Sequence, residues 1–187
     1  MLAQIDGDAP HFDVVYLPAN LHNRPAEIPA AVEQAVAAAD PHDRVFIVYA
    51  DCGTGGLLDP VVERLGATRL PGAHCYEFFA GADAFAAISA AELGTFYLTD
   101  FLARHFDALV VQGLGLDRHP ELRDQYFAHY TRVVLLSQSD DPELLHLGHR
   151  AAERLGLAFV HRHVGLGPFS TAVSAALTVA ATTAAAP

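Results

Sequence analysis

The sequence predicts an α/β fold, a single Rossmann-like or flavodoxin-like three-layer sandwich around a mostly parallel sheet. Two observations lead to this prediction. Short apolar runs alternate along the chain with segments whose apolar residues recur at helical spacing. Most of these runs also stop at polar or glycine-rich turns, and in an open α/β sheet such turns share the edge where ligands bind.

Length and composition indicate one domain. The chain has 187 residues, of which 52% are hydrophobic, and this is enough for one sizeable core. No internal repeat or linker divides it, so we expect a single α/β domain over residues 1–180. The alanine- and threonine-rich residues 181–187 are expected to form a frayed tail.

Five runs are expected to be strands because they are short, apolar and bounded by turn residues. The run 45–50 (VFIVYA) has no polar residue at all, which is typical of a strand buried on both faces of a parallel sheet. Residues 108–111 are either another short strand or the end of a helix, and both interpretations stay open. In chain order, the expected strands are 13–19, 45–50, 68–70, 132–138 and 158–164.

Helices are expected between these strands, where apolar residues recur at helical spacing. Pro25 opens the first helix, since proline is tolerated in a first helical turn, and Gly156 ends the helix that begins near Pro142. Thr95 is a suitable N-cap for a helix over 94–106. In chain order, the expected helices are 25–39, 57–65, 82–92, 94–106, 121–130, 142–155 and one from about residue 170.

The charge of the chain excludes several classes of function. Its formal net charge is −11, and it has no basic cluster of the kind that neutralises nucleic-acid phosphates. All eleven cationic residues are arginines, so no lysine can serve a Walker motif, a Schiff base or general-base catalysis. No stretch is apolar enough for a membrane span, and residues 1–11 lack the pattern of a signal peptide. We therefore expect a cytoplasmic protein that binds neither nucleic acid nor membrane.

Two cysteines and two histidines indicate a metal site at the predicted ligand-binding edge. Cys52 and Cys75 are each expected at the end of a strand, His22 follows the first strand, and His74 adjoins Cys75. Thiolate and imidazole ligands suit zinc or iron, and three protein ligands with one open position are the usual arrangement of a catalytic zinc site. The alternative is that both cysteines are inert buried thiols and that His22 is a structural residue.

The turn after the run 45–50 is a candidate cofactor site. It contains Asp51, Gly53, Thr54, Gly55 and Gly56. Glycines let the backbone approach a ligand closely, and backbone amides in such a turn can hold a phosphate. The Cys-Gly-Thr-Gly-Gly sequence also looks like the first motif of class I methyltransferases, which bind S-adenosylmethionine. Asp51 departs from that motif, and residues 68–71 lack the acidic residue that should bind the ribose.

Acid–base chemistry without a metal is a third interpretation. Glu77, Asp100 and His119 are natural proton donors and acceptors. Asp100 lies in an otherwise apolar stretch, where a carboxylate needs a partner or a ligand. His119 belongs to the charged segment 117–119 of a glycine-rich loop, and the alternative for that segment is a simple solvated loop.

Five blocks of the sequence resemble domain-of-unknown-function family 1638. The blocks are Leu21–Asn23, Tyr49–Gly56, His74–Gly81, Gly94–Phe101 and Gly115–Pro120. The resemblance spans about residues 14–167 and implies no established activity. It implies only that members often accompany corrinoid-dependent methyltransferase systems for methylated amines. It also adds weight to one shared site formed by His22, Cys52, His74, Cys75, Glu77, Asp100 and His119.

The main hypothesis from the sequence is a metal-binding protein, with one-carbon or methyl-group metabolism as its expected setting. Zinc or iron would be held by Cys52, Cys75 and one of the two histidines, His22 or His74. The fourth ligand or the proton carrier would be Glu77 or His119.

Two alternatives remain, and each implies different partners. One is a non-catalytic carrier of a metal, a corrinoid or a tetrapyrrole, and the other is an S-adenosylmethionine-dependent methyltransferase. A small-molecule or cofactor ligand and a corrinoid-dependent methyltransferase system are the expected partners. A homodimer is a further expectation if the aromatic-rich stretch 96–106 is a dimer face, although a core position suits that stretch better.

Overall fold

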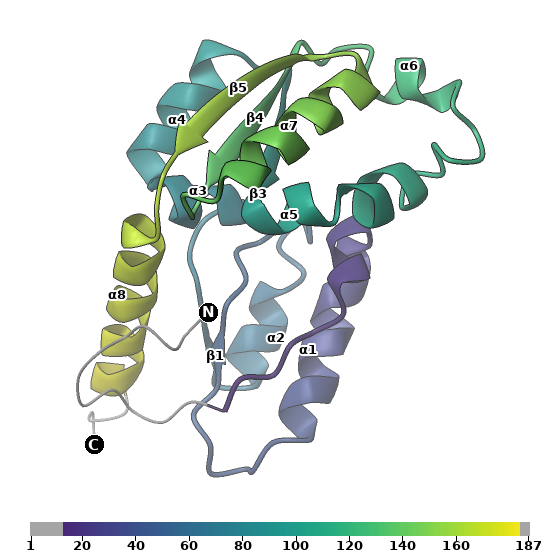
Figure 1. The fold of residues 1–187 in the computed structure, drawn as a ribbon. Coiled ribbons are helices and arrows are strands. Elements are labelled where there is room, and N and C mark those ends of the chain that lie inside the picture. Colours follow the sequence, from purple (N-terminus) through teal and green to yellow (C-terminus); the bar gives the residue numbers. More distant parts are fainter. Residues whose placement is uncertain (1–12, 184–187) are drawn as a thin grey trace.

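The structure, a computed structural model, describes residues 13–183 and has an α/β fold (Figure 1). β1 (Phe46–Ile47) pairs with β2 (Thr68–Arg69) in a two-stranded sheet. β4 (Arg132–Ser137) lies between β3 (Thr95–Thr99) and β5 (Ala158–His163) in a three-stranded sheet. All three strand pairs are parallel. The α/β class and the parallel pairing are therefore confirmed, and the strands form two sheets where one was expected.

The helices are η1 (Ala19–Asn23), η2 (Pro25–Glu27), α1 (Ile28–Ala37), α2 (Asp59–Arg64), α3 (Cys75–Ala80), α4 (Ala82–Ala91), α5 (Asp100–Arg104), η3 (Asp107–Gln112), α6 (Leu122–Tyr126), α7 (Pro142–Leu155) and α8 (Gly167–Thr183). η1 and η2 are 3₁₀-helices, and η3 is a π-helix. α5 and α7 cover one face of the larger sheet, whereas α3 and α4 lie on the other (Figure 1). α8 packs against α3 and β2, so the chain returns to the smaller sheet.

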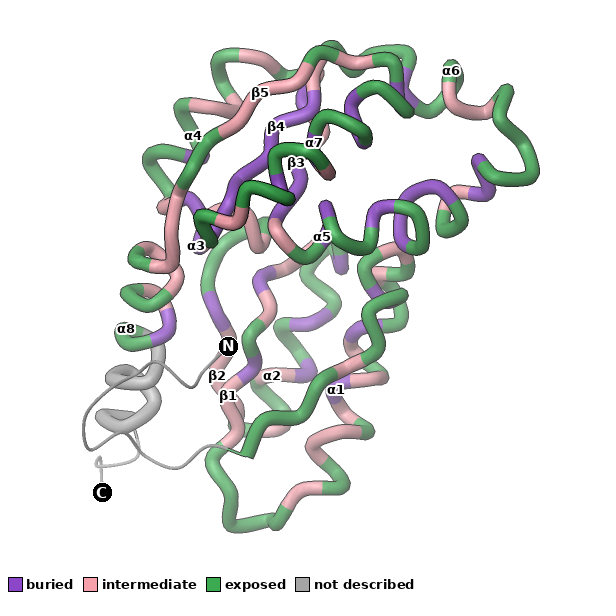
Figure 2. The backbone as a smooth tube through the Cα atoms, in the orientation of Figure 1, coloured by how far each residue is buried: buried purple, intermediate pink, exposed green. Residues whose placement is uncertain are grey.

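The deepest part of the core surrounds β4. Residues 133–136 are each 0% exposed, and Figure 2 shows buried backbone concentrated along β3 and β4. Leu135 packs among side chains of α5 and α7, and Val134 packs with Phe85 of α4. Successive side chains of a strand point to opposite faces, so a strand with apolar layers on both sides is apolar throughout.

A second apolar cluster packs α1 and α2 beside the smaller sheet, with Ile47 of β1 among its buried residues. Beyond β1 the backbone pairing continues without regular strand geometry. Leu70 N donates to Ile47 O (3.1 Å), Asp51 N to Gly72 O (3.0 Å) and Cys52 N to Ala73 O (2.9 Å). The pairing of β1 and β2 thus extends into the turns that hold both cysteines.

The expected strand over 13–19 is wrong. Residues 13–18 have no regular secondary structure, and η1 begins at Ala19. Val15 and Tyr16 are 70% and 80% exposed. An apolar run becomes a strand only where a neighbouring chain segment accepts its backbone hydrogen bonds, and no strand lies beside this one within the described residues.

The expected helix over 94–106 is also wrong, because this stretch is β3 followed by α5. β3 reads Thr-Phe-Tyr-Leu-Thr, which is rich in the β-branched and aromatic residues that pack well in sheets, and it pairs with β4 along its whole length. Thr99 rather than Thr95 is the N-cap, since its Oγ1 accepts from Leu102 N (3.3 Å). Pairing with β4 therefore made residues 95–99 a strand, although their apolar spacing favoured a helix.

The expected strand over 45–50 is a strand only over Phe46–Ile47, and Val48 is 43% exposed, so it is not buried on both faces. Other elements agree with the sequence more closely. β4, α7 and β5 match the predicted 132–138, 142–155 and 158–164, and residues 108–111 take the helical alternative as part of η3. The last helix begins at Gly167 and reaches Thr183. Residues 1–12 and 184–187 lie outside the described residues. They include the N-terminal stretch in which no signal peptide was expected and most of the expected tail. Among the helices that the structure describes, none is long and apolar enough to cross a membrane.

Candidate functional site

The candidate site forms where the turns after β1 and β2 meet. Cys52 lies in the first turn, and Cys75 is the first residue of α3, five residues beyond Leu70 at the end of the β2 pairing. Both side chains pack against the same apolar cluster, and both cysteines are free thiols. Each thiol is the main influence on the pKa of the other, so the two side chains are close neighbours. The structure therefore brings the two cysteines together, with Cys75 at the start of a helix and not at the end of a strand.

Hydrogen bonding makes these two thiols unequal. The pKa of Cys52 is lowered to about 7, first because the Cys75 thiol donates to its sulfur and then because backbone N–H groups do the same, while burial opposes the effect. The pKa of Cys75 is raised, because its proton is held in that hydrogen bond and because it is buried. Near neutral pH a substantial share of Cys52 is therefore thiolate, while Cys75 keeps its proton.

Two tyrosines flank the thiols as neutral phenols. The pKa of Tyr49 and that of Tyr76 are both raised, mainly by burial and further by the negative charge of the cysteines. Tyr76 Oη donates to Tyr97 O (3.4 Å). The side chains of Tyr49 and Tyr76 therefore add no negative charge beside the Cys52 thiolate.

Asp51 organises the glycine-rich turn around Cys52. Its carboxylate accepts hydrogen bonds from Thr54 Oγ1 (2.5 Å), Gly56 N (2.7 Å) and Gly55 N (3.1 Å). These bonds lower the pKa of Asp51, that from Thr54 having the largest effect. Cys52 has a φ of +49°, the only positive value at a non-glycine residue in the described range. Such a conformation is strained and persists only where neighbouring contacts hold it.

Glu77 organises the second turn. Its Oε1 accepts from Ala73 N (3.1 Å) and His74 N (3.2 Å), so it caps the start of α3 and places Cys75. Gly72 has a φ of +101°, and a Cβ there would lie 2.8 Å from Glu77 Oε2. The turn therefore needs glycine both for its conformation and for space.

Asp100 lies at the edge of the larger sheet and joins β3 to β4. Its carboxylate accepts from Gln138 N (2.8 Å), Ser139 N (3.0 Å) and Ser139 Oγ (2.7 Å), and its own N–H donates to Gln138 Oε1 (3.1 Å). The partner that this carboxylate needs is thus the backbone at the end of β4.

The other predicted site residues are distributed more widely. His22 lies in η1, and burial lowers its pKa. His119 lies in the exposed loop before α6, with Nδ1 3.3 Å from Glu121 Oε1. In residues 13–183 no three or more His, Cys, Asp or Glu side chains are grouped so as to hold a metal ion.

Sequence reasoning missed a cluster at the carboxyl end of β4 and β5. Ser137 Oγ lies 2.9 Å from His161 Nε2 and 3.1 Å from His163 Nδ1, and Asp140 Oδ1 lies 3.4 Å from the same nitrogen of His163. The signal was present as His-Arg-His in an expected strand, because residues two apart on a strand share a face.

The comparison with known families decides the affiliation of the chain. The family described as "Protein of unknown function (DUF1638)" matches residues 16–173. The chain belongs to this family. The resemblance found in the sequence is therefore confirmed, and the DUF1638 match includes every predicted site residue. No curated protein and no solved structure matches the chain.

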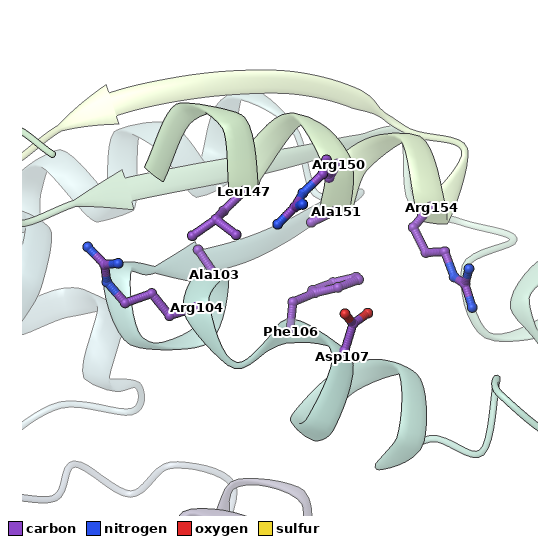
Figure 3. A pocket seen from close by; sticks show the side chains of 8 residues that line it. All are labelled: Ala103, Arg104, Phe106, Asp107, Leu147, Arg150, Ala151 and Arg154. Atoms are coloured by element: carbon purple, nitrogen blue, oxygen red, sulfur yellow. The ribbon is translucent and has the colours of Figure 1, made fainter. Parts of the chain in front are cut away.

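This DUF1638 protein also has a shallow pocket of about 250 Å³ between α5, η3 and α7 (Figure 3). Figure 3 shows Arg150 and Arg154 on α7 facing Phe106 and Asp107. None of the predicted site residues lines it. The thiol pair is therefore a candidate site because of its chemistry and not because it lies in a pocket.

Proposed function

We propose that Cys52 and Cys75 form a dithiol reaction centre, in which the Cys52 thiolate attacks an electrophilic sulfur and Cys75 completes the exchange. The observation that carries this proposal is that paired turns bring two free thiols into one apolar cluster, where each shifts the pKa of the other. The thiolate is the nucleophilic form of cysteine, and an attacking thiol works best when its pKa is near the ambient pH. The pKa of Cys52, about 7, meets this condition.

The proposed reaction is thiol–disulfide exchange. The Cys52 sulfur attacks one sulfur of a substrate disulfide, and the other substrate sulfur leaves as a thiolate. Cys75 then gives its proton to the thiolate that left in the first step, and its sulfur attacks the Cys52 sulfur of the mixed disulfide. The second half of the substrate leaves as a thiolate. The substrate disulfide is thereby reduced to two thiols, and the two cysteines are oxidised to one disulfide.

The surroundings of the pair suit this division of roles. Cys75 is the more deeply buried thiol and keeps its proton, so Cys52 is the one that meets a substrate first. The expected cytoplasmic location would keep both thiols reduced between reactions. Asp51 and Glu77 hold the two turns in place and take no part in the exchange.

The full chain is well suited to a test, because Cys52 and Cys75 are its only cysteines. A chromogenic aromatic disulfide should release both of its halves from the wild type and leave an intramolecular disulfide. Cys75→Ser should release one half and stop at a mixed disulfide on Cys52. The pH midpoint of alkylation at Cys52 should also rise from about 7 in the wild type toward about 8.5 in Cys75→Ser. A stable mixed disulfide in the wild type would exclude the exchange.

A second candidate is the zinc or iron site expected from the sequence. The observation in its favour is that two sulfur ligands share one point of the fold, and thiolates suit both metals. His22 or His74 would have to move in to supply the third ligand. A zinc-bound thiolate can accept a methyl group, which is the one-carbon chemistry expected beside a corrinoid-dependent system.

Elemental analysis tests this second candidate. Tag-free protein purified without chelator should contain about one metal ion per chain, and both Cys52→Ser and Cys75→Ser should lose it. A folded wild type that stays metal-free after reconstitution under reducing conditions would exclude the metal site. It would leave the dithiol proposal intact, since exchange needs no metal.

The S-adenosylmethionine interpretation has less support in the geometry. The amides of Gly55 and Gly56 already donate to Asp51, so the turn does not present them to a cofactor. Calorimetric titration of the folded protein with S-adenosylmethionine should therefore show no heat of binding.

A further inference from the structure

The pocket between α5, η3 and α7 has an apolar base. Ala103, Phe106 and Ala151 line it, and all three are buried in the apolar cluster that packs these helices on the larger sheet. Core side chains are close-packed, so the base of the pocket keeps its shape. At about 250 Å³ the pocket is smaller than the roughly 300–1,000 Å³ of pockets for drug-sized ligands. It therefore suits a small molecule.

Two arginines of α7 line this pocket without a partner. Arg150 and Arg154 are four residues apart and so are neighbours on the helix surface. Within residues 13–183 neither guanidinium has a hydrogen bond or an ion pair, whereas most other arginines of the chain bind a carboxylate. Two like charges at this spacing repel each other, and an anion bound to both would remove that repulsion.

Asp107 is the charge opposite the two arginines. Figure 3 shows its side chain on η3, across the pocket from α7. In the part of the chain that the structure describes, the Asp107 carboxylate has no hydrogen bond and forms no ion pair, even with Arg150 or Arg154. The third arginine of the pocket, Arg104, is bound by Asp141 and Glu143. The pocket thus offers two free cations on one wall and a free hydrogen-bond acceptor on the other.

We infer that this pocket binds a small phosphorylated polyol, with its phosphate on Arg150 and Arg154 and a hydroxyl on Asp107. A phosphate monoester has a charge of about −2 above pH 7, which two guanidinium groups neutralise. Guanidinium groups also bind phosphate oxygens through paired hydrogen bonds. A hydroxyl can donate to the Asp107 carboxylate, whereas a second anionic group there would be repelled. This site is separate from the thiol pair and does not depend on the function proposed for it.

The first test titrates the full chain with glycerol 3-phosphate at pH 7.5 and follows the arginine Nε–H signals by NMR. The ionic strength is kept constant, so that general screening does not change during the titration. Among the eleven arginines, Arg150 and Arg154 should shift first, and their shifts should saturate. Shifts that begin at other arginines, that do not saturate or that are absent would overturn the inference.

Glycerate is the matched ligand for the phosphate, because it has a carboxylate in place of the phosphate and keeps two hydroxyls. Its single charge is neutralised by one arginine, so it should bind at least about tenfold more weakly than glycerol 3-phosphate. Equal affinity for the two ligands would overturn the assignment to a phosphate.

Variants then assign the two arginines. Arg150→Gln and Arg154→Gln should each weaken glycerol 3-phosphate binding, measured by calorimetry, by about tenfold or more, since hydrogen bonds between charged groups are the strong ones. Arg44→Gln is the matched control, because Arg44 is exposed, lies outside the pocket and also has no side-chain partner within the described residues. An equal loss in Arg44→Gln would mean that the anion binds to surface charge in general and would overturn the inference.

Asp107→Ala tests the contact with the hydroxyl. It should weaken the binding of glycerol 3-phosphate by about threefold or more, but not that of methyl phosphate, which has no hydroxyl. Tighter binding of both ligands would show that Asp107 only repels the phosphate and would overturn its assigned role. Cys52→Ser/Cys75→Ser should bind glycerol 3-phosphate as the wild type does, so failure of the dithiol proposal and failure of this one are distinguishable.

Discussion

The smaller and the larger sheet of this protein differ in the length of their strands and in the side chains that follow those strands. β1 and β2 pair over only two residues each, and the turns that follow them hold the thiol pair. β3, β4 and β5 pair over five or six residues, and their carboxyl ends hold the serine and two histidines. At both edges the carboxylates bind backbone amides: Asp51 and Glu77 at the smaller sheet and Asp100 at the larger.

The comparison teaches which groups remain for chemistry at a parallel sheet edge. Turns after strands leave backbone N–H groups without a sheet partner, and a carboxylate can accept several of them. A thiol is a weaker hydrogen-bond acceptor than a carboxylate, and an imidazole offers fewer acceptor sites. These groups therefore pair with one another or with a hydroxyl. At each edge the carboxylates thus hold the turns, whereas the thiols and imidazoles contact other side chains.

The largest expected difference between the two sheets is in stability. Leu135→Ala, at a 0% exposed position of β4, should lower the free energy of unfolding by about 4 kcal/mol, because it leaves a cavity between β4 and the helices α5 and α7. Ile47→Ala in β1, at a 6% exposed position, should cost about 2 kcal/mol. Urea unfolding followed by circular dichroism measures both. An equal or larger loss in Ile47→Ala would mean that the smaller sheet is the better packed of the two.

The next effect concerns the carboxylate that joins β3 to β4. Asp100→Asn should cost about 2 kcal/mol in the free energy of unfolding, since charge-assisted bonds to two backbone amides and a hydroxyl are weakened. Asp107→Asn is the matched control, because the Asp107 carboxylate has no hydrogen bond or ion pair in the part of the chain that the structure describes. Equal stability of the two variants would show that Asp100 does not hold the larger edge together.

Helix packing on the larger sheet should produce an effect of about 1–3 kcal/mol. A Cβ at Gly148 of α7 would lie 2.5 Å from Phe159 Cε2 and 3.3 Å from Leu135 Cδ2. Gly148→Ala should therefore lower the melting temperature, even though alanine is the better helix former. A rise in melting temperature would show that α7 can move away from the sheet at little cost.

The smallest effect should come from the smaller sheet and should depend on pH. The folded pKa of Asp51 lies below its ordinary value, so in acid the folded protein binds fewer protons than the unfolded chain does. This stability is fully present above about pH 4 and is lost as the pH falls through the lowered pKa. Asp51→Asn should be less stable than the wild type by about 1 kcal/mol or less at pH 7.

Unfolding measured from pH 7 to pH 2 checks this expectation. The difference between the wild type and Asp51→Asn should shrink as the pH falls. Glu63→Gln, which removes an exposed carboxylate from α2, should leave the stability at pH 7 unchanged. A difference that stays constant down to pH 2 would mean that the Asp51 carboxylate does not hold the turn.

The sequence allowed the thiol pair to be anticipated but not the roles of its neighbours. Cys52 and Cys75 each stood beside glycine-rich turns after apolar runs, and parallel pairing brings such turns together. Asp100 looked like an acid or base because its amide partners, Gln138 and Ser139, come from a distant segment that only the folded chain brings near. The partners of Glu77 are local, since its carboxylate accepts from Ala73 N and His74 N at the start of α3. The contact of His161 with Ser137 is not visible in the sequence, because the two residues are 24 positions apart.

By itself the sequence determined the α/β class, the elements from β4 to β5 and the family, since these depend on local apolar pattern and on contiguous blocks of residues. The tertiary structure alone decided that the strands form two sheets, that residues 95–99 are a strand and that residues 13–18 are not. The physical reason is that a strand needs a partner for its backbone hydrogen bonds. That partner is supplied by a distant segment, so the local pattern does not reveal it.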